Sequence, residues 1–120
     1  MLGSGGAARA VAYALYRLDI RFGIVSRTPG PGKITYKELS PRLVSSRKLI
    51  INATPLGMPK FQGQYPDIPY DHISAEHLLF DLIYNPAETP FLNKGKTKGA
   101  RTENGLVMLQ AQAEKAWEVW

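Results

Sequence analysis

The chain has 120 residues, 44% hydrophobic and 21% charged, a balance typical of one globular domain that excludes an intrinsically disordered protein. It contains no cysteine, which excludes disulfide scaffolds, thiolate metal sites and a cysteine nucleophile. The formal net charge of +5 comes from scattered basic residues, so we expect a solvated surface that attracts an anionic cofactor rather than nucleic acid. The sequence has no apolar run near the roughly 20 residues that a membrane span needs and no signal-peptide pattern at its start. We therefore expect no membrane contact and a cytoplasmic location.

A glycine-rich segment, Gly3-Ser4-Gly5-Gly6-Ala7-Ala8, opens the chain, and apolar residues at helical spacing follow it as far as Leu18. Glycines at a turn into a helix let backbone amides approach the pyrophosphate of a dinucleotide. The pattern therefore predicts a cofactor loop followed by a helix, the alternative being a glycine-rich turn with no ligand. The residues expected to contact the cofactor here are Gly3, Ser4, Gly5, Gly6 and Ala7.

The next strand is predicted at residues 21–26, and Ser26-Arg27-Thr28 follows at its end. In dinucleotide-binding folds an acidic residue at this position hydrogen-bonds a free ribose 2′-hydroxyl, whereas a cation suits a 2′-phosphate. The chain has no Asp or Glu there, which favours NADP as the cofactor bound by Ser26, Arg27 and Thr28. The alternative is that Arg27 is a solvated surface charge.

The Pro-Gly segment 29–32 predicts a turn, and residues 36–44 a weak helix. Residues 48–53 form a continuous apolar run, typical of a strand covered on both faces of a parallel sheet. The carboxyl ends of such strands flank the cofactor crevice, so we expect Asn52 and Thr54 to face the cofactor, although an ordinary strand exit explains the pattern as well. The loop 55–69 is long enough to suggest a function.

The rest of the chain continues the alternation of strands and helices. The pattern predicts a strand at 78–84, a helix at 89–98, a strand at 100–103 and a final helix at 105–120. The expected fold is therefore α/β, a doubly wound, mostly parallel sheet of the Rossmann type. His72 and His77 have no Asp, Glu or His partners at ligand spacing, so no metal site is expected.

The start of the chain raises a separate expectation. In this fold the first strand lies at the sheet centre, and a typical strand has about five or six residues. Only Met1 and Leu2 precede Gly3. We therefore expect residues 1–120 to be a partial NADP-binding domain with a truncated first strand, marginally stable alone because unpaired buried backbone groups cost roughly 1 to 3 kcal/mol each.

Five motifs together resemble one enzyme family. They are the glycine loop, Ser26-Arg27-Thr28, Asn52-Ala53-Thr54-Pro55-Leu56-Gly57-Met58, Asp81-Leu82-Ile83-Tyr84-Asn85-Pro86 and Asn104-Gly105-Leu106-Val107-Met108-Leu109-Gln110-Ala111-Gln112-Ala113. Their order and spacing resemble the C-terminal NADP-binding domain of shikimate dehydrogenase, over essentially the whole chain. Many relatives have Asn in place of Ser26.

The resemblance implies roles for further residues. Leu82 and Gly105 correspond to positions that flank the nicotinamide, and Tyr84 and Gln112 to residues that this domain extends toward shikimate. The family's Lys/Asp pair, which handles the hydroxyl proton, belongs to an N-terminal domain, so the isolated chain is expected to bind NADP without turnover. A quinate-type oxidoreductase and a non-catalytic NADP-binding module are the alternatives.

Overall fold

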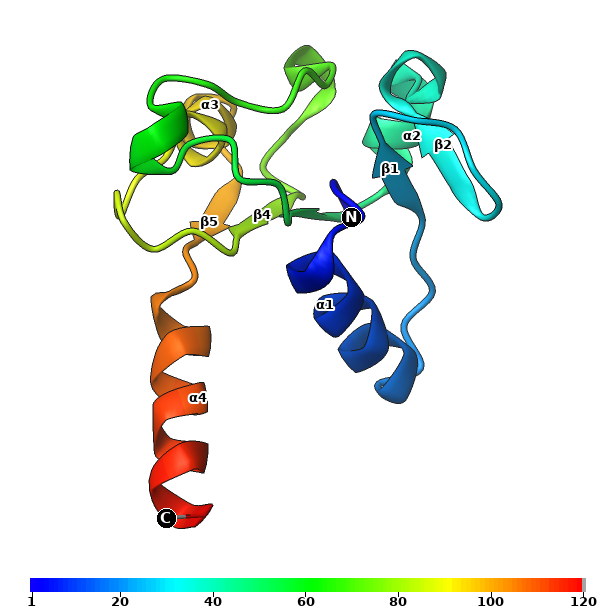
Figure 1. Cartoon of the computed structure of the whole chain (residues 1–120). Coiled ribbons are helices and arrows are strands. Elements are labelled where there is room, and N and C mark those ends of the chain that lie inside the picture. Colours follow the sequence, from blue (N-terminus) through cyan, green and yellow to red (C-terminus); the bar gives the residue numbers. More distant parts are fainter. Residues whose placement is uncertain (120) are drawn as a thin grey trace.

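The computed structural model describes the backbone of residues 1–119 and the side chains of residues 1–111 and 114. Strands and helices alternate along the chain as the sequence predicts (Figure 1). The helices are α1 (Gly6–Arg17), α2 (Pro41–Ser46), α3 (Pro90–Thr97) and α4 (Leu106–Val119). The strands are β1 (Ile24–Ser26), β2 (Lys33–Thr35), β3 (Leu49–Asn52), β4 (Leu78–Asp81) and β5 (Arg101–Glu103). Single 3₁₀ turns lie at Tyr36–Glu38, Pro59–Phe61 and Tyr70–His72.

The strands form two parallel groups, β2 beside β1 and β3-β4-β5 in that order. Helices α1 and α4 extend on one side of the strands, and α2 and α3 lie on the other (Figure 1). Parallel strands covered by helices on both faces are the doubly wound α/β arrangement. The predicted fold class is therefore confirmed.

Leu2 joins the two groups of strands. Its amide donates to the carbonyl of Ile51 and its carbonyl accepts from the amide of Ala53, both at 2.8 Å. The amide of the next residue, Gly3, donates to the carbonyl of Val25, also at 2.8 Å. Leu2 thus bridges in parallel to both Val25 and Asn52 and occupies the central position between β1 and β3. The glycine loop starts directly from this central position.

The hydrophobic core runs across the whole sheet. Leu2, Val25 and Ile50 belong to the same buried cluster as Leu79 and Phe91, which are completely buried. Helix α3 lies close against β4 because Gly95 faces Leu79, where an added Cβ would overlap the leucine side chain. The core therefore fixes the strands whose carboxyl ends carry the predicted site residues.

Element boundaries differ from the sequence predictions for local reasons. The predicted strand 21–26 is a strand only from Ile24, as β1, and the carbonyl of Gly23 accepts from the amino group of Met1 at 2.8 Å. The predicted helix 36–44 is a 3₁₀ turn followed by α2, since Ser40 before Pro41 is extended, as residues that precede proline usually are. Strand β2 was not predicted; its three residues pair with the other edge of β1.

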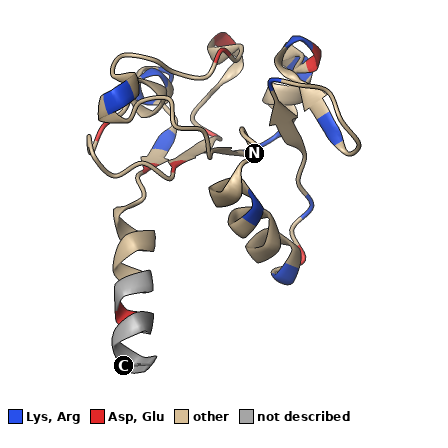
Figure 2. Ribbon diagram, viewed as in Figure 1, with Lys and Arg blue, Asp and Glu red and all other residues tan. Residues whose placement is uncertain are grey.

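Basic residues are spread over several elements rather than gathered along one face (Figure 2). Within the described part of the chain, three lysines pair with acidic residues: Lys48 with Glu76, Lys96 with Glu88, and Lys98 with Asp71. Lys96 and Lys98 lie among four basic residues that are close together in the sequence, with Lys94 and Arg101, so the charge of this short segment is partly neutralised. None of the described helices combines the length and the apolar character that crossing a membrane requires.

Candidate functional site

The glycine loop presents an open helix start. Gly3 has φ +106°, and an added Cβ would lie 2.9 Å from the carbonyl oxygen of Ala53, so only glycine fits there. Around Gly5 and Gly6 an added Cβ would meet no atom within 4 Å. Gly5 is the N-cap of α1 and provides no side-chain cap, and the first turn has no acidic residue. The amides of this turn are therefore available to an anion such as a pyrophosphate.

The predicted 2′-phosphate residues lie next to this loop. The Oγ atoms of Ser4 and Ser26 are 3.3 Å apart, and the amide of Thr28 donates to the Ser26 Oγ at 3.4 Å. Arg27 is exposed and forms no ion pair within the described part of the chain. Burial raises the pKa of the neighbouring Tyr36, and the positive charge of Arg27 partly offsets this. The buried Ser26, bonded to Ser4, and the exposed Arg27 thus follow one another at the end of β1.

Asn52, at the end of β3, directs its polar atoms into the protein. Its Oδ1 accepts from the amide of Thr54 at 3.0 Å and from the Thr54 hydroxyl at 2.6 Å. Its Nδ2 donates to the carbonyl of Leu56 at 3.3 Å and to Asp81 Oδ2 at 3.2 Å. The side chain is completely buried. Asn52 therefore shapes the loop that follows β3, and a contribution to cofactor binding would act through that loop.

Asp81, at the end of β4, is a buried carboxylate that the sequence analysis did not single out as a site residue. Its Oδ1 accepts from the amide of Ile83 at 3.0 Å, and its Oδ2 accepts from the Thr89 hydroxyl at 2.6 Å as well as from Asn52. Burial raises the pKa of Asp81, and these three hydrogen bonds oppose the rise. The available signal was an acidic residue inside the apolar run 78–84.

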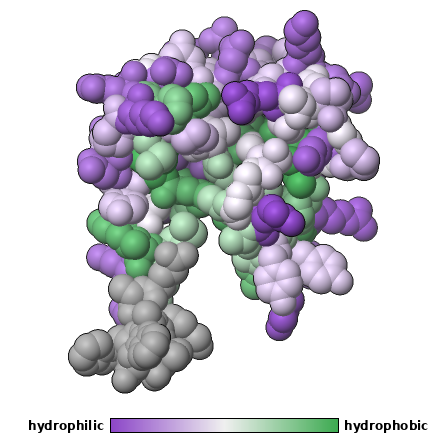
Figure 3. Space-filling view, viewed as in Figure 1, coloured by the Kyte–Doolittle hydropathy of each residue, from purple (hydrophilic) through white to green (hydrophobic). Residues whose placement is uncertain are grey.

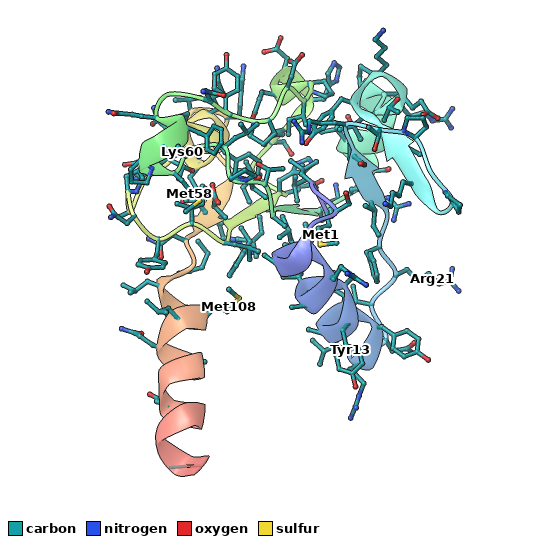
Figure 4. The ribbon with its side chains drawn as sticks, viewed as in Figure 1. Met1, Tyr13, Arg21, Met58, Lys60 and Met108 are labelled. Atoms are coloured by element: carbon teal, nitrogen blue, oxygen red, sulfur yellow. The ribbon has the colours of Figure 1, made fainter. Side chains whose placement is uncertain are left out.

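A cavity of about 660 Å³ lies at the carboxyl ends of the strands. Its lining comes from the glycine loop, from the loops after β3 and β4, and from Met108 on α4. Apolar side chains border the hollow between α1 and α4 (Figure 3), and Met108 leaves α4 on the side that faces α1 (Figure 4). A smaller cavity of about 290 Å³ lies at the opposite, amino ends of β1 and β3. Doubly wound sheets bind ligands at the carboxyl ends, which selects the larger cavity.

Six of the predicted site residues line this cavity: Gly5, Gly6, Ala7, Thr54, Leu82 and Tyr84. The Tyr84 side chain is 48% exposed. Gly105 lies behind the cavity wall, where its amide donates to the carbonyl of Ile83 at 3.2 Å and an added Cβ would overlap the carbonyl oxygen of Leu82. The side chain of Gln112 lies outside the described residues.

His77 has a structural role in the fold, whereas His72 is exposed. His77 is buried, its Nδ1 accepts from the amide of Ser74 at 3.0 Å, and its Nε2 lies 2.8 Å from the carbonyl oxygen of Val44. It thereby ties the start of β4 to α2. Within the described part of the chain, no group of three or more His, Cys, Asp or Glu side chains could hold a metal ion.

Comparisons with known proteins agree with this geometry, although no family model matches the chain. The chain is 42% identical to the shikimate dehydrogenase (NADP(+)) of Carboxydothermus hydrogenoformans over 134 aligned residues, which cover all of this chain and 48% of the relative. It spans about half the length of the curated relatives that it matches.

Solved structures of two different enzymes also match the chain. Shikimate 5-dehydrogenase from Thermus thermophilus, in complex with NADP(H) and shikimate, matches with a TM-score of 0.82 and 31% identity over 99% of this chain and 47% of that chain. A 5-ketofructose reductase of a Gluconobacter species matches with a TM-score of 0.75 and 28% identity over 99% and 48%. The resemblance to shikimate dehydrogenase read from the five motifs is confirmed along the whole chain.

Proposed function

We propose that this chain is the NADP(H)-binding domain of a shikimate dehydrogenase, the enzyme that reversibly reduces 3-dehydroshikimate to shikimate with NADPH. The observation that carries the proposal is the contact between the uncapped glycine loop and the Ser26-Arg27-Thr28 segment, 3.3 Å apart at Ser4 and Ser26. One dinucleotide phosphate group would bind at the helix start, and the 2′-phosphate would bind beside it.

The residues around this contact fit NADP(H) better than NAD(H). Arg27 offers a planar guanidinium, and Ser26 and Thr28 offer hydroxyls, all without a competing carboxylate in the segment. A free 2′-hydroxyl would leave the guanidinium without its partner. When bound, the nicotinamide of the cofactor supplies the hydride for reduction. The cofactor's adenosine end would thus lie at β1, with the nicotinamide end toward Leu82 and Gly105.

The substrate side of the proposal concerns Tyr84 and Gln112. The Tyr84 phenol is partly exposed at the cavity, where it can donate a hydrogen bond to a polyol without adding charge. Gln112 would add a carboxamide from α4, as the family resemblance implies. A related enzyme with another small polyol or ketone substrate is the second candidate, which the match to a 5-ketofructose reductase supports. Shikimate, quinate and 5-ketofructose assays of the full-length protein separate the two candidates.

The 120-residue chain alone is expected to show no shikimate-dependent formation of NADPH. Oxidation of the shikimate hydroxyl by NADP⁺ needs a group that accepts the hydroxyl proton, and Tyr84 is the only described residue lining the cavity whose side chain ionises. We propose that the proton-transferring Lys/Asp pair lies outside these residues. The assay follows NADPH absorbance in the purified chain, with a full-length shikimate dehydrogenase as the positive control. Turnover by the purified chain above the no-enzyme blank would contradict this part of the proposal.

A non-catalytic NADP-binding module is the remaining alternative, and it shares the cofactor site. The two possibilities differ in what accompanies the chain. If the full-length protein binds NADPH tightly yet converts none of the three substrates, the module is favoured; conversion of shikimate favours the dehydrogenase.

A further inference from the structure

Strands β3 and β4 end side by side, and a cavity-lining loop leaves each of them. Asn52 and Asp81 are register partners at these two strand ends. The loop after Asn52 contributes Ala53, Thr54 and Pro55 to the cavity, and the loop after Asp81 contributes residues 82–85. The separation of the two loops therefore contributes to the shape of the proposed cofactor cavity, which the glycine loop and Met108 also line.

The Asp81 carboxylate is hydrogen-bonded directly to its own loop and, through Asn52, to the other loop. It accepts the amide of Ile83, in its own loop, and the Nδ2 of Asn52, whose Oδ1 orders Thr54 in the other loop. The third donor is the Thr89 hydroxyl, at the start of α3. Asp81, Asn52 and Thr89 are all completely buried, so water does not compete for these bonds.

Thr89 also lies close to the loop after β3. Gly57 has φ +107°, and a Cβ added there would lie 3.2 Å from the Cβ of Thr89. This loop thus passes close to Thr89 at a position where only glycine fits well. The Thr89 hydroxyl accepts from the amide of Leu92 and so also caps α3. The three side chains join β3, β4, α3 and both loops in one network.

The network requires an acceptor at position 81. An ionised carboxylate has only acceptor oxygens, and here it receives three donors. Asparagine at the same position would turn its NH₂ group, itself a donor, toward at least one of these three donors. The Oδ1 of Asn52 is already occupied by the amide and hydroxyl of Thr54, so flipping Asn52 would break those bonds. A carboxylate is therefore matched to its partners, whereas the isosteric amide is not.

We propose that Asp81 is a positioning residue for the dinucleotide site, holding the loops after β3 and β4 at the separation that admits the cofactor. The identity of the ligand rests on the function proposed above, whereas the coupling of the two loops does not. Asp81 does not touch the cofactor; it acts through Asn52, Ile83 and Thr89.

Binding of NADPH to the parent chain and to Thr89 variants tests the effect on the site. Thr89→Val keeps the shape but removes the hydroxyl, and we expect it to raise the Kd for NADPH about tenfold, the effect of losing roughly one buried hydrogen bond. Thr89→Ser keeps the hydroxyl and should bind within about twofold of the parent. Thr97→Val is the matched control, because its hydroxyl bonds to Lys94 on the exposed side of α3. Equal affinity of the Val and Ser variants at position 89 would overturn the positioning role.

Amide hydrogen exchange tests the coupling of the loops without any ligand. In Asp81→Asn, we expect the amides of Ile83 and Thr54 both to exchange about tenfold faster than in the parent chain. Thr89→Val should accelerate the same two amides by a smaller factor. The amide of Leu43, capped by Ser40 outside the network, should keep its rate. Acceleration at Ile83 alone would overturn the proposal, because Thr54 would then be held independently. If the two amides accelerate together but the parent chain does not bind NADPH, the proposed function is wrong, whereas the coupling of the two loops is confirmed.

Discussion

Replacing Arg27 by alanine is expected to weaken NADPH binding by ten- to a hundredfold while NADH binding stays within about twofold. A hydrogen bond to a charged phosphate contributes about 1.5 to 3 kcal/mol, and about 1.4 kcal/mol corresponds to a factor of ten in affinity. Arg27 is exposed and unpaired in the described part of the chain, so its removal breaks no internal ion pair. The folded chain should therefore remain intact.

The matched control for Arg27→Ala is Arg101→Ala. Arg101 is an exposed arginine on β5, at the far edge of the sheet from β1, and its removal changes the net charge equally. Calorimetric titration of the parent and both variants with NADPH and NADH separates a local phosphate contact from a general electrostatic effect. If Arg101→Ala loses as much NADPH affinity as Arg27→Ala, or if NADH binding falls in parallel, the 2′-phosphate assignment is wrong.

Leu2→Ala is expected to lower the free energy of unfolding by about 2 to 5 kcal/mol, the usual cost of emptying a buried leucine site. The Leu2 side chain is 2% exposed and belongs to the main core cluster. Leu2 is also the residue through which β1 and β3 are joined, so a cavity beneath it loosens both groups of strands. Urea denaturation followed by circular dichroism measures the change.

Leu18→Ala is the control for this substitution, because Leu18 is 69% exposed at the end of α1. Its effect should stay within about 0.5 kcal/mol, as for most surface positions. A loss at Leu2 no larger than the loss at Leu18 would show that the central position contributes little to stability, contrary to the packing described above.

Much of the fold was predictable because its signals are local. Glycines at 3, 5 and 6 followed by an alanine-rich helix predicted the turn into α1, and the continuous apolar run at 48–53 predicted a strand covered on both sides. A helix was predicted at 89–98, and α3 occupies Pro90–Thr97 with its first turn capped by the Thr89 hydroxyl, which accepts from the amide of Leu92. Hydrophobic periodicity and capping depend on neighbouring residues, which a single sequence displays.

Features that depend on distant partners were not predictable from the same patterns. Asn52 was expected to face the cofactor, yet its Nδ2 donates to the buried carboxylate of Asp81 on the neighbouring strand. The Asp81 network joins residues separated along the chain by 29 positions, and no local pattern reports such a contact. Strand β2 is equally dependent on context, since its three residues are ordered by pairing with β1.

The most direct test of the whole account is a calorimetric titration of the folded 120-residue chain with NADPH and, separately, with NADH. The account predicts one NADPH site per chain, with a Kd at least about tenfold lower than that for NADH, because the 2′-phosphate meets Arg27 beside the glycine loop. Equal affinity for the two nucleotides, tighter binding of NADH, or no binding of either would contradict it.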